Sequence, residues 1–350
     1  MKTLLRLLLK SQHQQNRSGP AQTEKGMTLV ELLVGSIMAF LIITPMLGFV
    51  VDMLNTDRRE QVKSNTEQDL QTAVDFISQD LSQAIYIYDQ AGINDIQKTT
   101  TKLPPSPVNT TGTPILVFWK RQQMKNSLPI SSTVSTQEPK DCKNTPADCN
   151  DTYVLSLVAY YQIKETVSTS IWCQPSGVTC PSRIARYEIR EPIRNPYTTD
   201  AKKPYYDAEY LTDSQQGSAA FNKDFDFNAP TVNVTMGAGF PNPEVLVNYI
   251  DHSAGPILTP CTTALGNPID PKTDIPVPEE TLKITDTASA PNTNSFYACV
   301  DTSKNIARVT IRGNSLRRLQ ADAKYDVKNP QSPFFPTATV QVKGLGARGK

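Results

Sequence analysis

The chain has 350 residues, of which 38% are hydrophobic and 20% are charged, so it can bury a sizeable core and lacks the composition of a disordered protein. Its formal net charge is +1. The first 26 residues hold five basic side chains against one acidic one, which leaves −3 for the remainder. This balance excludes a protein that binds nucleic acid through a large basic surface, and no nucleic-acid partner is expected.

An apolar segment extends from Met27 to Val51 and contains one ionisable residue, Glu31. About 20 helical residues cross the hydrocarbon of a bilayer, so the sequence predicts one transmembrane helix over residues 27–53. A carboxylate at mid-membrane costs on the order of 2.5 kcal/mol or more. The carboxylate of Glu31 therefore needs a compensating partner or a specific function, whereas a helix that only anchors a protein would not need this residue.

Residues 1–26 are polar and basic up to Gly26, which is the reverse of the order in a secretory signal peptide. The excess of Lys and Arg holds this end in the cytoplasm by the positive-inside rule. We therefore expect a single-pass membrane protein whose C-terminal part lies outside the cytoplasm.

The run from Lys25 through Gly26 and Met27 to Glu31 resembles the processing site of type IV prepilins and type II secretion pseudopilins. The resemblance implies that residues 1–26 are a leader, which a prepilin peptidase removes between Gly26 and Met27 before the new amino terminus is N-methylated. It also implies that Glu31 neutralises the amino terminus of a neighbouring pilin during assembly. The expected partners are other pilins or pseudopilins, an inner-membrane platform and a cytoplasmic assembly ATPase, with no cofactor. Met27 departs from the Phe that is more common at this position.

Two features of the span have a plainer alternative. Glu31 is also compatible with a simple signal anchor, in which the carboxylate reaches the interface. Pro45 removes a helical hydrogen bond and Gly48 weakens the helix, so a kink is predicted there. Both residue types are also tolerated in membrane helices without consequence.

An amphipathic helix is predicted to continue over residues 54–90 as a stalk. Its apolar stripe recurs at intervals of four and three residues, as packing on a sheet or on a partner helix requires: Leu70, Val74, Ile77, Leu81, Ala84 and Tyr88. The remaining positions suit a solvated face and include Arg58, Arg59, Glu60, Lys63, Glu67, Asp69, Asp75 and Asp80.

Residues 91–350 form the predicted extracytoplasmic β-rich domain. Its strand-like runs are Pro114–Trp119, Tyr153–Ile163, Arg183–Arg190, Thr231–Met236 and Ala298–Arg312, separated by turn-rich segments. The expected fold is α+β, with a long helix packed on an antiparallel sheet and long loops, as in pilins. The end of the chain, residues 341–350, is expected to be a mobile tail.

All six cysteines follow residue 140, and their even number suits an oxidising compartment. The preferred pairing is Cys142 with Cys149, Cys173 with Cys180 and Cys261 with Cys299, although sequence leaves fifteen pairings open. A zinc site is the alternative, but the spacings are not those of a zinc knuckle, and no metal is expected.

Little in the sequence indicates an enzyme, so no catalytic residue is assigned. His252 is the one histidine beyond the leader, and no G-x-S-x-G motif accompanies it. Asp224 and Asp226 alternate with aromatic residues, which suits an edge strand better than calcium or glycosidase chemistry. Tyr205, Tyr206 and Tyr210 are compatible with a binding module. The alternative function is thus a membrane-anchored extracytoplasmic binding module or hydrolase.

Removal of the leader would leave 324 residues, which is large for a major pilin. By size and cysteine-containing loops the chain resembles cyanobacterial pseudopilins linked to hormogonium polysaccharide secretion, and after them the W-type and J-type minor pilins. The expected function is a minor subunit of a type IV pilus or a secretion filament, serving motility, adhesion or polysaccharide export.

Overall fold

The structure is a computed structural model that describes residues 28–97, 103–104, 106–130, 149–190, 193, 196–197, 243–286, 293–326, 328 and 332–346. Contacts divide the chain into two compact units, one ending at Asp57 and one beginning at Arg58. The second unit is called the outer unit below. The predicted strand at Thr231–Met236 lies outside the described residues.

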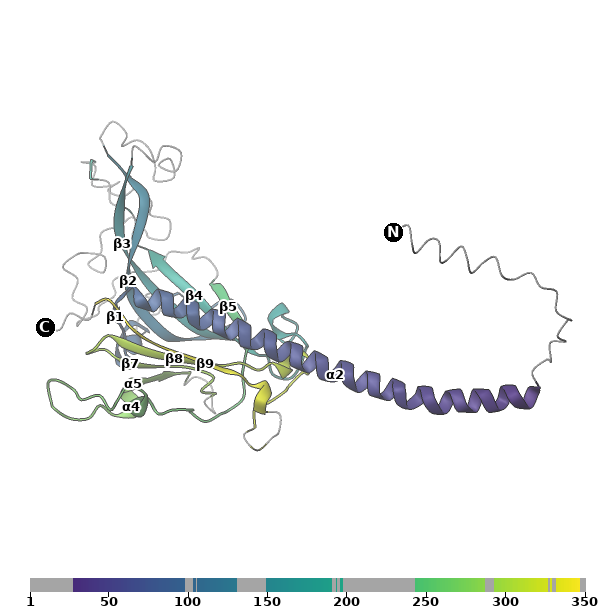
Figure 1. The fold of residues 1–350 in the computed structure, drawn as a ribbon. Helices are drawn as coiled ribbons and strands as arrows, with labels where there is room; N and C mark the ends of the chain where they lie inside the picture. The colour runs from purple at the N-terminus through teal and green to yellow at the C-terminus, as the bar shows by residue number, and fades with distance from the viewer. Residues whose placement is uncertain are drawn as a thin grey trace, which may run out of the picture. The chain divides into compact units, whose positions relative to one another are not determined.

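A single helix, α2, extends from Leu29 to Ser82 and crosses from the first unit into the outer unit (Figure 1). Its buried side chains begin at Thr66 and follow the predicted stripe through Leu70, Val74, Ile77 and Leu81. The stripe is buried at this end because the helix packs there on the sheets of the outer unit.

The prediction that this helix continues to Tyr88 is wrong. The helix ends at Ser82, and the next residues form strand β1, Ala84–Ile87. Ala84 and Tyr88 are buried as the stripe predicts, but from an extended backbone. Alternating Ile and Tyr favour a strand, and pairing with a neighbouring strand prevails over the helical period in this segment.

Five antiparallel strands form the larger sheet in the order β1-β2-β3-β4-β5. Three of them contain predicted strands and are longer than expected: β2 at Thr110–Pro129, β3 at Cys149–Glu165 and β4 at Ser182–Arg190. The edge strand β5, Glu244–Ile250, was not predicted. Residues 121–129 pair with residues 149–155 beyond the ends of β1 and β4, so part of the β2–β3 hairpin projects as a two-stranded ribbon.

The second sheet has four antiparallel strands in the order β6-β7-β8-β9. Their bounds are Lys283–Thr285, Phe296–Asp301, Ile306–Arg312 and Thr337–Lys343. The predicted strand Ala298–Arg312 is a hairpin of two strands, because Asn305 turns the chain with a positive φ of 52°. Part of the predicted mobile tail, residues 341–343, instead belongs to β9, where Val342 pairs with Ala307.

Short helices connect these strands. They are α3 at Gln90–Gln97, α4 at Cys261–Ala264, α5 at Glu279–Leu282, and the 3-10 turns at Ile171–Cys173, Leu316–Arg318 and Ser332–Phe334.

One core joins helix α2 to both sheets. It contains Leu70 and Ile77 of the helix together with Trp119 of β2 and Val309 of β8. The sheets also meet at one corner, where Ile250 forms an isolated bridge with Gly313. A Cβ on Gly313 would lie 2.8 Å from the Thr66 methyl group, so the absence of a side chain there lets the helix approach. The observed architecture is the α+β, pilin-like layout that the sequence predicts.

Candidate functional site

The first half of α2 presents apolar side chains in every direction. From Leu29 to Leu54 its large hydrophobic residues are between 48% and 82% exposed. Among the described residues, α2 is the one helix with the length and composition to cross a membrane. A helix that is apolar all round is stable where hydrocarbon or other helices cover it. The helix therefore supports single-pass membrane anchoring.

Glu31 lies in the first turn of this helix and is exposed. Its backbone N–H donates to the Thr28 carbonyl oxygen at 3.0 Å and is 3.3 Å from Thr28 Oγ1, so Thr28 caps the helix. A carboxylate in the first turn also interacts favourably with the helix dipole. The predicted cleavage residues Gly26 and Met27 lie outside the described residues, so the cleavage site and the Glu31 pairing stay predictions.

Pro45 and Gly48 both lie inside α2, which is continuous through them. A side chain at Gly48 would meet no neighbour within 4 Å, so packing does not explain this glycine. The helix has no break here, and a bend at these residues stays a prediction.

Two of the preferred disulfides are present. Cys173 is bonded to Cys180, and Cys261 to Cys299. Cys149 is also disulfide-bonded, whereas its predicted partner Cys142 lies outside the described residues. The Cys173–Cys180 bond closes the loop that follows β3, and the Cys261–Cys299 bond joins α4 to β7.

A buried ionic cluster fixes the C-terminal part of α2 to the larger sheet. Asp80 Oδ1 accepts from Lys120 Nζ at 2.9 Å, and Asp80 Oδ2 accepts from Arg186 Nε and the Tyr160 hydroxyl, each at 2.7 Å. Glu188 completes the cluster, because its carboxylate accepts from Arg186 Nη2 at 2.6 Å. Two positive and two negative charges therefore lie together beneath the helix.

The prediction that Asp80 belongs to a solvated face is wrong, because the residue is 7% exposed. Burial by itself would raise the pKa of Asp80. The hydrogen bond and charge of Arg186, the charge of Lys120 and the Tyr160 hydroxyl together lower this pKa below its ordinary value. Burial, followed by the neighbouring Asp80 charge, raises the pKa of Tyr160. Asp80 is thus an ionised acceptor that joins three strands to the helix.

His252, the candidate histidine for an enzyme, lies beside a second buried ion pair. Its neighbour Asp251 accepts from Arg312 Nε at 2.9 Å, and both of these side chains are at most 2% exposed. Burial lowers the pKa of His252, and the nearby Asp251 charge offsets part of that effect. Neither ring nitrogen of His252 has a hydrogen-bond partner in the described part of the chain. A general base in a triad is oriented by such a bond, and no described residue supplies one to His252.

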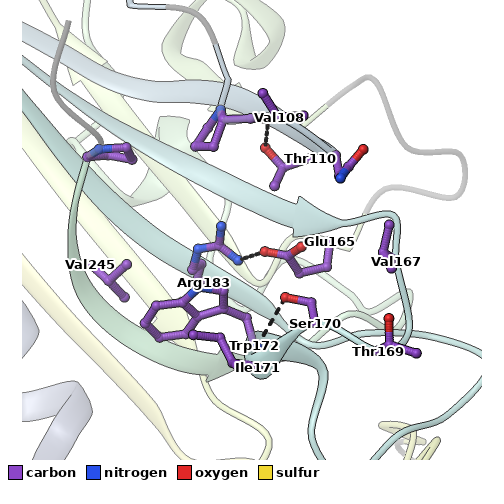
Figure 2. A pocket seen from close by; sticks show the side chains of 13 residues that line it. Val108, Thr110, Glu165, Val167, Thr169, Ser170, Ile171, Trp172, Arg183 and Val245 are labelled. Atoms are coloured by element: carbon purple, nitrogen blue, oxygen red, sulfur yellow. Dashed lines mark hydrogen bonds and ion pairs between the residues drawn. The ribbon is translucent and has the colours of Figure 1, made fainter. Parts of the chain in front are cut away.

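A cavity of about 500 Å³ opens at the end of the larger sheet where β3 ends and β4 begins (Figure 2). Its charged side chains are Glu165 and Arg183, which form an ion pair and are each 5% exposed. The Arg183 guanidinium lies 5.0 Å from the centre of the Trp172 ring. Around them are apolar groups, of which Val108 and Ile171 are 89% and 79% exposed, and the polar residues Asn109, Thr110, Thr169 and Ser170.

Backbone and loop contacts shape this cavity. Ser170 Oγ accepts from the Trp172 backbone N–H at 3.3 Å and so starts the 3-10 turn that carries Ile171 and Trp172. The Asn109 carbonyl oxygen accepts from the backbone N–H of Thr166 at 3.0 Å, which ties the start of β2 to the loop after β3. The Cys173–Cys180 bond follows directly, so covalent and hydrogen bonds fix the wall that contains Trp172.

The remaining sequence candidates lie outside the described residues: Asp224, Asp226, Tyr205, Tyr206 and Tyr210. Within the described residues, no group of three or more His, Cys, Asp or Glu side chains is arranged to hold a metal ion.

Sequence reasoning missed the Asp80 cluster and the Trp172 cavity. Lys120, Arg186 and Glu188 lie in or beside predicted strands, and Glu188 is two residues from Arg186 and so on the same strand face. Charged side chains at alternate positions of a buried strand indicate that an oppositely charged side chain lies nearby. The partner on α2 is not visible in the sequence, because Asp80 is 106 residues away from Arg186.

Comparison of the chain with protein-family models, with curated proteins and with solved structures gives no match in any of the three.

Proposed function

We propose that this protein is a subunit of a type IV pilus or a related secretion filament, made as a prepilin and assembled through α2. The observation that carries the proposal is one helix with two different environments. Its first half is apolar and exposed with a carboxylate in the first turn, and its second half is packed on antiparallel sheets. The disulfides of the outer unit support an extracytoplasmic location for that unit.

The proposed mechanism is mechanical. The positive leader keeps the amino terminus in the cytoplasm, and α2 inserts into the inner membrane. Prepilin peptidase cleaves after Gly26 and exposes an amino group on Met27. Glu31 of a neighbouring subunit then pairs with this amino group, which offsets the cost of a carboxylate in an apolar helix bundle. A cytoplasmic ATPase, acting through a membrane platform, supplies the work of extraction.

Cleavage is tested first, with the full chain coexpressed with a prepilin peptidase. The wild-type protein should begin at an N-methylated Met27, and the Gly26→Val variant should remain uncut, because a branched side chain at Gly26 obstructs the peptidase. Intact-mass and N-terminal peptide mass spectrometry measure both products.

Gly35→Val is the matched control, because Gly35 lies in α2 and a side chain added there would meet no neighbour within 4 Å. This variant should be cut normally. A wild-type chain that stays uncut, or is cut beyond the apolar segment, contradicts the filament proposal and favours an anchored hydrolase or binding module.

Assembly is tested separately with Glu31→Leu, which keeps the helix apolar and removes the carboxylate. We expect the subunit to insert into the membrane but to be lost from sheared filaments in the native host, because the amino group of Met27 would lack its partner. Quantitative immunoblotting of filament and membrane fractions measures the loss.

Glu60→Leu removes an exposed carboxylate from the same helix, one that pairs with Lys63 at 3.8 Å, and should leave incorporation unchanged. Equal incorporation of the Glu31 and Glu60 variants would show that Glu31 has no role in assembly.

A further inference from the structure

The cavity beside Trp172 lies in the outer unit, and its chemistry selects a class of ligand. Its volume of about 500 Å³ lies within the range of small-molecule sites in proteins, roughly 300–1,000 Å³. It is formed by segments on both sides of β3 and β4, whose relative positions are fixed by strand pairing. The cavity is therefore a preformed part of the fold.

The charges of the cavity cancel. Among its lining residues, Arg183 and Glu165 are the ionised pair, and they bond to each other. A strongly anionic ligand would approach the Glu165 carboxylate, and a cationic ligand would approach the Arg183 guanidinium. Either ligand would be attracted by one member of the ion pair and repelled by the other, so the two electrostatic effects would offset each other. The electrostatics thus favour a neutral ligand.

The hydrogen-bonding groups of the pair are only partly used. Arg183 donates from Nη1 to Glu165, and its buried Nε–H has no acceptor among the described residues. A guanidinium has five N–H donors and a carboxylate has about four acceptor sites. The guanidinium supplies hydrogen-bond donors and the adjacent carboxylate supplies acceptors. Together they match a ligand group that both accepts and donates, as a hydroxyl does. The hydroxyls of Thr110, Thr169 and Ser170 add weaker sites of the same kind.

Apolar surface surrounds these polar groups. Val108 and Ile171 are exposed at the cavity, and Trp172 and Val245 form further walls, as Figure 2 shows. A ligand that is neutral, rich in hydroxyl groups and covered elsewhere by C–H groups matches this arrangement. Sugar rings have that combination, because their hydroxyls lie at the ring edge and their C–H groups lie on the faces. A peptide segment matches less well, since one backbone amide supplies only one donor and one acceptor.

We propose that the cavity between β3, β4 and the Trp172 loop binds a neutral saccharide unit. The Glu165–Arg183 pair receives adjacent hydroxyls, and Val108, Ile171 and Trp172 contact the C–H surface. This function goes beyond filament assembly and does not depend on it, since every residue involved belongs to the outer unit.

Binding is measured on the full chain in a detergent without a sugar headgroup, with maltotetraose, cellotetraose and chitotetraose as neutral probes. The chain has two tryptophans, and Trp119 is fully buried in the core, so ligand-induced fluorescence changes report on Trp172. At least one probe should shift the emission and titrate to saturation by calorimetry. An acidic tetrasaccharide, tetragalacturonate, should bind about tenfold more weakly or worse, because its carboxylates would approach Glu165 and, unlike hydroxyls, could not donate a hydrogen bond to it.

Two neighbouring residues give a matched pair of variants. Thr169 lines the cavity, whereas Ser168, next to it on the same exposed loop, does not. Thr169→Phe should abolish binding by filling the cavity, and Ser168→Phe should leave it unchanged. Arg183→Lys keeps the positive charge but loses the planar donor fork, so it should weaken binding by about tenfold.

Three outcomes overturn the proposal. In the first, no neutral probe binds at concentrations up to about 10 mM, which corresponds to a dissociation constant weaker than millimolar. In the second, the Thr169→Phe and Ser168→Phe variants bind the neutral probe equally well. In the third, an uncharged tetrapeptide binds in the cavity and the sugars do not. Filament assembly and leader cleavage are scored in the same strains, so failure of sugar binding and failure of the filament proposal are distinguishable.

Discussion

Replacing Asp80 with Ala should lower the free energy of unfolding by about 3–5 kcal/mol, the cost of removing one partner from a buried ion pair. The substitution leaves Arg186 and Lys120 with their charges buried, and it removes the acceptor of the Tyr160 hydroxyl. Urea unfolding, followed by the fluorescence of the buried Trp119 in β2, measures the change. We expect a lower midpoint with an unchanged slope.

Asp75→Ala is the control for this result. Asp75 lies on the same helix and is exposed, where it accepts a hydrogen bond from Gln71 Nε2 at 2.9 Å. Its loss should change the free energy of unfolding by no more than about 0.5 kcal/mol, as for surface positions in general. Similar effects for the two variants would mean that the cluster does not hold the helix to the sheet.

The same cluster gives stability a defined dependence on pH. The pKa of Asp80 is lowered in the folded protein, so the unfolded state binds the proton more tightly. The stabilisation by the ionised carboxylate is complete above about pH 4, near the pKa of an unfolded aspartate, and is lost as the pH falls through the lower folded pKa. The free energy of unfolding of Asp80→Asn should fall less steeply over that acidic range than that of the wild type.

The second large effect concerns the Cys261–Cys299 disulfide, which spans 38 residues. Replacing both cysteines with Ala should cost about 4 kcal/mol, because the unfolded chain gains the entropy of an open loop. The bond lies in a small hydrophobic cluster with Leu282 and Tyr297. Thermal or urea unfolding of the double variant, compared with the wild type, measures the cost.

The Cys173–Cys180 pair provides an internal comparison. Its separation is 7 residues, for which the loop-entropy relation gives about 2.5 kcal/mol. The 261–299 double variant should therefore be the less stable of the two. The reverse order would show that native contacts of the short loop, such as the Arg317 Nη1 hydrogen bond to the Pro175 carbonyl oxygen at 2.6 Å, outweigh the loop length.

The local features of the fold were predictable from the sequence because each depends on nearby residues. The apolar run after Met27 specifies a helix that is hydrophobic on all sides. The stripe from Leu70 to Leu81 specifies the helix face that packs on the sheets. The runs in β2, β3 and β4 contain β-branched and aromatic residues. The disulfides at Cys173–Cys180 and Cys261–Cys299 also follow the predicted pairing, and the first of them closes a loop short enough to form locally.

The end of α2 and the boundaries of the second sheet required the tertiary structure. Ala84 and Tyr88 continue the helical period, yet Tyr86 pairs with Trp119, because an added edge strand satisfies backbone groups that the helix end would leave open. β9 alternates polar and apolar residues, which is compatible with a half-buried strand, but this pattern does not specify the sheet that the strand joins. It is a strand because Val340 and Val342 pack on a core that β7 and β8 create.

The sequence by itself determined the long apolar helix, the position of its carboxylate and the general α+β layout, since hydropathy and periodicity act over a few residues. Only the tertiary structure decided that Asp80 is buried and that Glu165, Arg183 and Trp172 line one cavity. Polar residues acquire these positions when distant segments meet, as Asp80 meets Arg186 across 106 positions of the chain. The free energy of a buried charge depends on those distant partners, and no local pattern records them.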